Sequence, residues 1–130
     1  KLQQGLPLLA ECGGFMYLHD TFEDMEGNFC KGIGHITGKS YRTPRLSRFG
    51  YIQVNSKNGK LFGTDTGSST NCGTDCYAAK PESSRGWDCL HVTDTMLAGF
   101  PHFYYYGNPR LPMAFTDCCR AYRKHKKEGL

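Results

Sequence analysis

The sequence lacks any apolar run long enough to cross a membrane and any charged-then-apolar leader, so nothing in it suggests membrane insertion or export. It contains no internal repeat and no glycine-rich loop ending in Lys-Ser or Lys-Thr, the loop that cradles nucleotide phosphates. Nucleic-acid-binding motifs are also missing, and the net charge of only +4 fits an anionic substrate at least as well as a nucleic acid. These absences favour a cytoplasmic protein of single-domain length (residues 1–130) that binds neither membranes nor nucleic acids.

Cysteine, by contrast, is abundant, with seven residues in the chain. An odd number without an export signal argues against a complete disulfide framework, so we expect reduced thiols. Cys72 and Cys76 could provide two metal ligands, but the second cysteine pair or the His-x3-His unit of a usual zinc site is missing, and we predict no metal site. The alternative is a non-catalytic, cysteine-rich binding module in which a metal is held by Cys30, Cys72, Cys76 and Cys89.

Cys12 ends a short apolar run and is followed directly by two glycines. Residues 6–11 indicate a strand and residues 14–20 a short helix, so the cysteine would lie on a sharp strand-to-helix turn, as an elbow nucleophile does. This turn would aim the backbone N–H of Gly13 at a reacting carbonyl and place the thiol at a helix N-terminus, where thiolate is favoured. Small neighbours are expected because a Cβ there would collide with the crowded backbone. A buried structural cysteine beside a glycine-rich turn is the alternative.

The middle of the chain indicates strands and loops, and therefore an α/β fold. Residues 51–54 alternate as a strand does, and Gly59 favours a hairpin after it. Polar segments predict a turn over residues 23–32 and a loop over residues 63–76. Residues 98–106 form an extended aromatic run that is interrupted by a proline.

The last element is a helix with clear start and stop signals. Asn108 can cap it, Pro109 suits its first turn, and Gly129 ends it. Its apolar residues recur at helical spacing, at Leu111, Phe115, Cys118 and Tyr122. We expect its basic end to be a solvated helix terminus, where cations complement the helix dipole, rather than a nucleic-acid patch.

Four segments together resemble one enzyme family. Residues 5–18 are similar to the nucleophile motif of class I (triad-type) glutamine amidotransferases, and the form Ala-Glu-Cys-Gly-Gly-Phe-Met-Tyr-Leu resembles that of cobyrinic acid a,c-diamide synthase and its relatives. Residues 42–51 resemble the family's basic segment ending in Gly-Tyr, and residues 79–89 resemble a stretch seen in one of its branches. Residues 98–109 resemble its histidine motif, in which an aromatic run leads to Asn-Pro and the terminal helix.

The resemblance implies a partial glutamine amidotransferase domain, with a flavodoxin-like sheet flanked by helices. In it Cys12 would be the glutaminase nucleophile and His102 the base that activates it. The thiolate would attack the side-chain amide of glutamine, His102 would protonate the departing ammonia, and water would hydrolyse the thioester. The backbone N–H of Gly13 would be one oxyanion donor, worth about 3 kcal/mol. The other histidines are expected to be surface or core residues: His19, His35, His91 and His125.

The resemblance also implies a corrinoid partner, cobyrinate, whose carboxylates a and c are amidated in cobalamin biosynthesis. Arg42, Arg45 and Arg48 are candidates for binding such carboxylates, because guanidinium groups bind them bidentately. The alternative is that all three are solvent-facing hairpin charges. ATP and Mg²⁺ are expected on a synthetase domain absent from this chain, so we predict no cofactor within it.

The chain departs from the family pattern in ways that limit the predicted site. The resemblance implies that the early half of the amidotransferase domain lies outside this chain, and no Gly-His-Glu-Phe-His-Tyr stretch lies between residues 63 and 72. Many class I enzymes have a glutamate two residues after the histidine, but position 104 is tyrosine. We therefore expect a C-terminal fragment, inactive alone, with a Cys–His pair that has no obvious third member. A sheet edge exposed by truncation would favour self-association.

Overall fold

The computed structural model describes residues 1–45, 50–57, 75–83 and 85–129. Its helices are α1 (Gly13–Tyr17) and α2 (Arg110–Lys127), with short 3-10 turns η1 (Leu2–Gln4) and η2 (Tyr105–Gly107). Its strands are β1 (Leu8–Glu11), β2 (His19–Glu23), β3 (Phe29–Lys31), β4 (Ile36–Ser40), β5 (Gln53–Ser56), β6 (Cys76–Ala79), β7 (Gly86–Cys89), β8 (His91–Val92) and β9 (Met96–Gly99). Within these residues the strands form three sheets of three, in the orders β1-β9-β8, β3-β2-β4 and β5-β6-β7.

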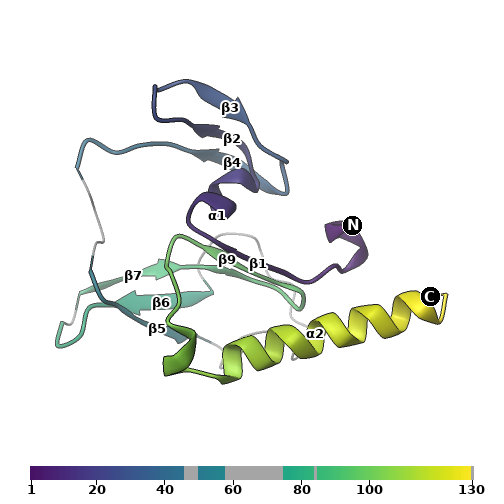
Figure 1. The fold of residues 1–130 in the computed structure, drawn as a ribbon. Coiled ribbons are helices and arrows are strands. Elements are labelled where there is room, and N and C mark those ends of the chain that lie inside the picture. The colour runs from purple at the N-terminus through teal and green to yellow at the C-terminus, as the bar shows by residue number, and fades with distance from the viewer. Residues whose placement is uncertain (46–49, 58–74, 84, 130) are drawn as a thin grey trace.

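Strand β9 is buried along its whole length and lies in the middle of the molecule. It runs parallel to β1 and antiparallel to β8. Figure 1 shows α1 and the β3-β2-β4 sheet on one side of β1 and β9, and α2 on the other. Successive side chains point to opposite faces, so Leu97 joins the cluster that includes α2, whereas Met96 and Ala98 join the cluster that includes α1. Because both faces of β9 are covered, the strand is apolar throughout.

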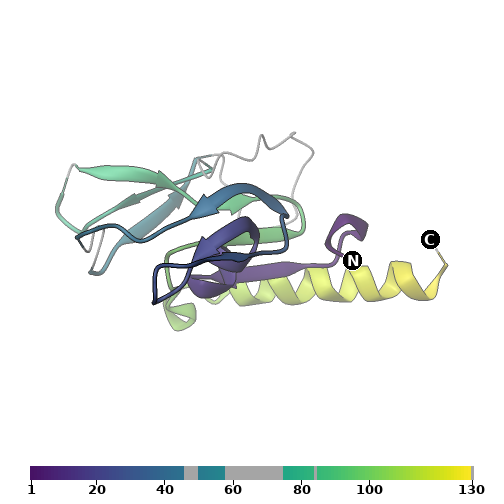
Figure 2. The same ribbon diagram turned by 90° about the horizontal axis from the view of Figure 1, so that it is seen from above.

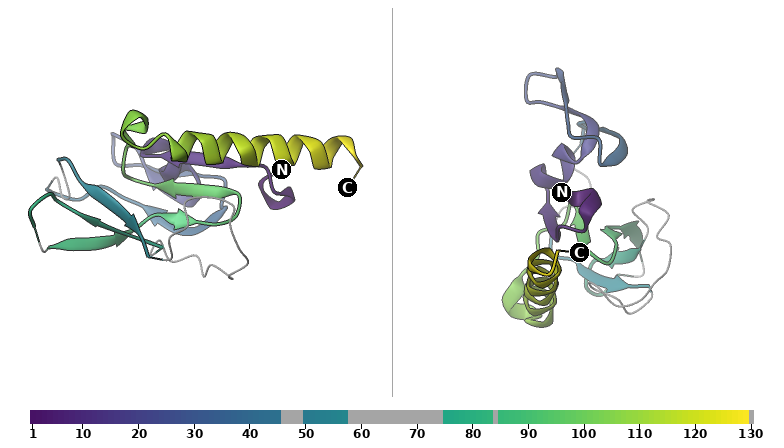
Figure 3. Two further views of the ribbon diagram at one scale, coloured as in Figure 1. Left: turned by 90° about the horizontal axis from the view of Figure 1, so that it is seen from below. Right: turned by 90° about the vertical axis from the view of Figure 1, so that its right-hand side faces the viewer.

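Helix α2 confirms the predicted C-terminal helix and its apolar stripe. Leu111 is buried, and Ala114, Phe115 and Cys118 pack against the same cluster. The side chain of Asn108 accepts the backbone N–H of Arg110 at 3.2 Å, at the start of the helix. The chain turns away at Gly129, with φ 74°. The exposed basic end extends beyond the strands (Figures 2 and 3), as a solvated helix terminus does.

Helix α1 is shorter than the helix predicted over residues 14–20. It ends at Tyr17, and His19 already belongs to β2. The carbonyl of Leu18 accepts the backbone N–H groups of His35 and Ile36, at 2.8 and 2.9 Å. In a longer helix the Leu18 carbonyl would accept a hydrogen bond from the next helical turn, but here it pairs with the segment at the start of β4. The local sequence pattern does not contain this long-range contact, so it could not predict where the helix ends.

The turn predicted over residues 23–32 is wrong for its second half, which contains β3. Only the connection between β2 and β3 is a turn, and it is closed by the carboxylate of Asp24. This group accepts the backbone N–H groups of Glu26 and Asn28, at 3.0 and 2.8 Å. Acceptance of the Asn28 N–H lowers the pKa of Asp24. A local side-chain bond therefore shortens the turn and lets β3 pair antiparallel with β2.

The remaining predictions have mixed outcomes. The strand predicted over residues 51–54 is displaced to β5, which pairs antiparallel with β6. The hairpin at Gly59 and most of the loop over residues 63–76 lie outside the described residues, while Cys76 belongs to β6. The extended run over residues 98–106 ends sooner than predicted, because η2 begins at Tyr105.

The α/β class is confirmed, with two helices and mixed sheets. Among the described strand pairs, however, only β1–β9 and β2–β4 are parallel, so these residues do not form one continuous parallel sheet. Neither described helix is both long and apolar enough to span a membrane.

Candidate active site

Cys12 occupies a backbone conformation that is unusual for a residue with a side chain. It lies between β1 and α1 with φ 48° and ψ −113°. Its N–H donates to the carbonyl of Gly99 at 3.0 Å, and its carbonyl accepts the N–H of Met16 at 3.0 Å. The conformation is therefore fixed from the sheet on one side and from the helix on the other. The predicted strand-to-helix turn at Cys12 is confirmed, and a conformation of this kind costs about 1–3 kcal/mol.

The steric reason predicted for the two glycines after Cys12 is wrong. A Cβ built on Gly13 meets no atom within 4 Å, and one on Gly14 meets only the Cβ of Ala10, at 3.8 Å, which is an ordinary contact. The crowded glycine is Gly99, where a Cβ would overlap the side chain of Leu90. The turn is thus open beside Gly13 and closed beside Gly99, on the neighbouring strand.

His102 lies at the same edge of the sheet as Cys12. Parallel pairing puts Glu11 of β1 opposite Gly99 of β9, so the residues that follow both strands emerge together. The Nδ1–H of His102 donates to Oε2 of Glu11 at 3.1 Å, and the His102 side chain is 72% exposed. No hydrogen bond joins the Cys12 thiol to His102, both of which are described residues. The structure therefore brings the two predicted residues to one edge through Glu11, and among the described residues Nε2 of His102 has no hydrogen-bond partner.

Two further residues at this edge, Glu11 and Tyr105, were not predicted from the sequence. The Glu11 side chain is only 19% exposed, and the hydroxyl of Tyr105 donates to its second carboxylate oxygen, Oε1. Burial, and then the hydrogen bond to Glu11 and its charge, raise the pKa of Tyr105 to about 12. One signal was present in the sequence: Glu11 is the single charged residue of the strand Leu8–Glu11.

Arg42 and Arg45, the two predicted arginines that the structure describes, form no hydrogen bond with Glu11, Cys12 or His102. The backbone N–H of Arg42 donates to the carboxylate of Glu23 at 2.8 Å, and its Nη1 donates to the carbonyl of Met25 at 3.0 Å, so Arg42 contacts the β2–β3 connection. Arg45 is exposed, and its carbonyl accepts the hydroxyl of Thr43. Both follow β4 rather than lie on a strand, and Arg48 lies outside the described residues.

Two of the other histidines are core residues, as expected. His19 is buried, and its Nδ1 lies 3.1 Å from the carbonyl of Phe15 and 3.3 Å from Oγ of Ser40. The imidazole of His19 thus connects α1 to β4. His91 is buried, and among the described residues its Nδ1 has no hydrogen-bond partner. Burial lowers the pKa of the His91 imidazole.

The three described cysteines among the proposed alternative metal ligands lie on two different sheets. Cys76 and Cys89 are opposite each other on β6 and β7, while Cys30 lies on β3 and Cys72 is outside the described residues. Across the part of the chain that the structure describes, no group of three or more His, Cys, Asp or Glu side chains could hold a metal ion. This arrangement does not favour the metal-binding module.

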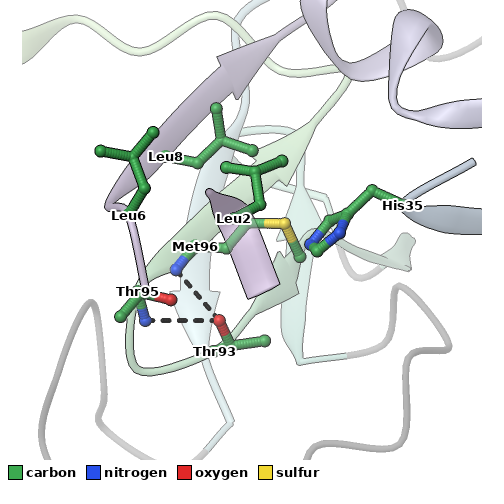
Figure 4. A pocket seen from close by; sticks show the side chains of 7 residues that line it. All are labelled: Leu2, Leu6, Leu8, His35, Thr93, Thr95 and Met96. Carbon is green, nitrogen blue, oxygen red and sulfur yellow. Dashed lines mark hydrogen bonds between the residues drawn. The ribbon is translucent and has the colours of Figure 1, made fainter. Parts of the chain in front are cut away.

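A cavity of about 220 Å³ lies at the opposite end of β1 and β9 (Figure 4). Its lining includes Leu8 and Met96, the first residues of these strands, and also His35. The hydroxyl oxygen of Thr93 accepts the N–H groups of Thr95 and Met96, at 3.3 and 3.0 Å, and so is already satisfied within the chain. The cavity is therefore separate from the edge that carries Cys12.

Comparison with known proteins gives related sequences but no related structure. No family profile matches the chain, and no solved structure matches it. It is 35% identical over 114 residues to a protein of Fusobacterium nucleatum named cobyrinate a,c-diamide synthase, covering 82% of this chain and 26% of that protein. It is 27% identical over 142 aligned positions to a protein of the same name from Priestia megaterium, covering 99% and 30%.

A third relative carries a related name. The chain is 31% identical over 119 residues to a protein of Pseudomonas aeruginosa named hydrogenobyrinate a,c-diamide synthase, covering 89% of this chain and 27% of that protein. The chain thus spans less than a third of the length of each of these three relatives.

Proposed function

This chain belongs to the cobyrinate a,c-diamide synthase family, and from that premise we propose that it is the glutaminase portion of an amidoligase. The enzyme would use ATP and glutamine to amidate carboxylates a and c of cobyrinate, as the names of the relatives suggest. This chain would release ammonia from glutamine. In this proposal, residues 1–130 would be the C-terminal part of a class I glutamine amidotransferase domain.

The observation that carries this proposal is the backbone of Cys12. Cys12 has φ 48° and ψ −113° and lies directly between a strand and a helix. Its thiol therefore has the placement that an elbow nucleophile requires. Such a conformation costs about 1–3 kcal/mol, and this cost supports a functional reason for it. His102 at the neighbouring strand end supplies a base for the same thiol.

The proposed reaction uses two residues in two steps. Nε2 of His102 takes the thiol proton of Cys12, the thiolate attacks the amide carbon of glutamine, and the same proton passes to the departing ammonia. Water, deprotonated by His102, then attacks the thioester, so that glutamate leaves and the thiol is restored. The backbone N–H of Gly13 would stabilise the oxyanion of each tetrahedral intermediate. The position that a Gly13 side chain would occupy is open, which supports the approach of a substrate to this turn.

The ligation itself would need groups that this chain does not provide. It has no phosphate-binding loop, so ATP and Mg²⁺ would act on another part of the enzyme, and they enter none of the steps above. Binding of corrinoid carboxylates by Arg42 and Arg45, and by Arg48, stays a proposal. Exposure of the first two supports it, and the bond from Arg42 to the carbonyl of Met25 leaves most of that guanidinium's donors available.

The unpaired outer edge of β1 supports a further proposal, self-association of the isolated chain. Among the described residues β1 is an edge strand, paired only with β9. An open strand edge is a template for pairing with a second copy. Light scattering of the isolated 130-residue chain tests this proposal, and a strictly monomeric species would contradict it.

A glutamine-analogue electrophile, such as a diazo-ketone, tests the glutaminase proposal in the complete polypeptide that carries this chain. Mass spectrometry should locate the label on Cys12, and His102→Ala should abolish labelling because the thiol then lacks its base. Cys119→Ser is the matched control, since this partly buried cysteine of α2 should not affect labelling. Unlabelled Cys12 in the complete polypeptide would contradict the proposal, and stoichiometric zinc in an elemental analysis would favour the metal-binding module instead.

A further inference from the structure

Glu11 has a position that its neighbours in β1 do not share. The strand is otherwise apolar, and Glu11 is its last residue, opposite Gly99 and directly before Cys12. Its carboxylate is mostly shielded from solvent, and each of its oxygens accepts from a different side chain. A carboxylate removed from water is stable only when such partners replace the lost hydration.

Both partners of Glu11 come from the segment that leads from β9 to α2. His102 donates to Oε2 at 3.1 Å, and the Tyr105 hydroxyl donates to Oε1. Backbone hydrogen bonds hold this segment in a compact turn, with the N–H of Gly107 donating to the carbonyl of Tyr104 at 3.0 Å. The carboxylate of Glu11 therefore holds the exposed imidazole of His102 by one oxygen, while its other oxygen is fixed by Tyr105.

The contact also selects the tautomer of the imidazole. A carboxylate can only accept, so Nδ1 of His102 must carry the proton, and the lone pair of the neutral ring then lies on Nε2. This is the nitrogen that must be free to accept the thiol proton in the proposed glutaminase reaction. An acidic residue that binds the far nitrogen of a catalytic histidine stabilises both the required tautomer and the cation formed during reaction.

We propose that Glu11 is the positioning residue for His102, in the place of the glutamate that position 104 lacks, and that Tyr105 in turn fixes the carboxylate of Glu11. This inference rests on the proposed function. It makes the site a relay of Tyr105, Glu11, His102 and Cys12, in which only the last two contact the substrate. Since the pKa of Tyr105 is raised to about 12, its hydroxyl stays a donor at neutral and moderately alkaline pH.

The test uses Glu11→Gln in the complete polypeptide, with glutamine and ammonium chloride compared as nitrogen donors for the ligation. The amide side chain that replaces Glu11 has nearly the same size but only one oxygen. Either His102 or Tyr105 therefore loses its hydrogen-bond acceptor in this variant. The glutamine-dependent kcat should fall about 10²–10⁴-fold, with the KM for glutamine within about threefold of its original value. The ammonia-dependent rate should stay unchanged, because free ammonia makes the glutaminase step unnecessary.

Two further variants make the result decisive. Tyr105→Phe should reduce the glutamine-dependent kcat about tenfold, since it removes one neutral hydrogen bond from Glu11. Asp117→Asn removes the charge of another ion-paired carboxylate, on the exposed face of α2, and should change neither rate.

Four outcomes would count against these ideas, and they can be told apart. A glutamine-dependent kcat of Glu11→Gln within about threefold of the unmodified enzyme would overturn the positioning role. Loss of the ammonia-dependent rate as well would show a purely structural effect, and would also overturn it. If instead Cys12→Ser keeps the glutamine-dependent rate, the proposed function itself fails. Should Glu11→Gln not fold, an unchanged kcat of Tyr105→Phe would overturn the relay.

Discussion

Cys12 and Cys76 are the same residue type in opposite settings. Cys76 lies within β6 with 1% of its surface exposed, in regular strand conformation, and burial raises the pKa of its thiol to about 12. Cys12 is partly exposed and lies at a strand end with φ 48°. The Cys76 thiol is therefore a neutral group packed in the core, whereas the backbone of Cys12 is in a strained conformation. The difference teaches that the local backbone, rather than the presence of a thiol, distinguishes the candidate nucleophile.

The largest expected effect is on glutaminase activity, and it should fall on one cysteine alone. Cys12→Ser should lower the glutaminase kcat by about 10³-fold or more, because a hydroxyl is a much weaker nucleophile than a thiolate. Cys76→Ser should leave kcat unchanged in the folded fraction, since this side chain is enclosed between strands. Ammonia release from glutamine, measured well below the melting temperature, compares the two, and equal losses would remove the distinction between them.

The effects of the same two substitutions on the free energy of unfolding should be in the reverse order, with the larger loss for Cys76→Ser. Cys76→Ser buries a hydroxyl in an apolar cluster and should lower the free energy of unfolding by about 1–3 kcal/mol. Cys12→Ser, at a partly exposed position, should change it by no more than about 0.5 kcal/mol. Urea denaturation curves of both variants provide the measurement, and a larger loss for Cys12→Ser would show that Cys12 is the structural thiol.

Replacement by glycine tests the backbone strain at Cys12 directly. Glycine adopts positive φ readily, so Cys12→Gly should raise the free energy of unfolding by about 1 kcal/mol while it abolishes labelling. The control is Cys119→Gly, inside α2, where glycine should instead lower stability by about 0.5–1 kcal/mol. Thermal melts separate the two signs, and a destabilised Cys12→Gly would mean that the turn is not strained.

The last prediction concerns alkaline pH. The thiol of Cys76 ionises near its ordinary pKa of 9.0 in the unfolded chain but only near 12 in the folded protein. The folded state therefore binds this proton more tightly, so the contribution to stability is complete below about pH 9 and is lost as pH rises toward 12. The melting temperature of the native sequence should fall more steeply between pH 8 and about pH 10.5 than that of Cys76→Ala. Parallel curves for the two proteins would contradict the raised pKa.

Local patterns in the sequence predicted the elements whose causes are local. The apolar stripe of α2 lies within the helix and its start and stop signals lie within two residues of its ends, and the strand, Cys12 and helix α1 follow one another without interruption. The end of α1 could not be predicted in this way, because the carbonyl of Leu18 is taken by a segment near Ile36. Long-range pairing overrode a helical pattern there.

The predicted site was incomplete for the same reason. The resemblance to a family paired Cys12 with His102, but no local pattern connects Glu11 with His102 or Tyr105. Their contact depends on the register of β1 and β9, in which Glu11 lies opposite Gly99. The family pattern places a glutamate at position 104, two residues after the histidine, whereas the carboxylate that contacts His102 lies 91 residues away in sequence.

That separation also has a consequence for the order in which the molecule assembles. The bonds from Glu11 to His102 and Tyr105 close loops of 91 and 94 residues. Closing so long a loop carries a large entropic cost before any contact compensates for it, and folds rich in such distant contacts form slowly. Helix α2 and the β2–β3 hairpin need only local contacts and can form early. The edge that carries Cys12 is complete only once these distant segments have met, so we expect it to be among the last parts of the protein to form.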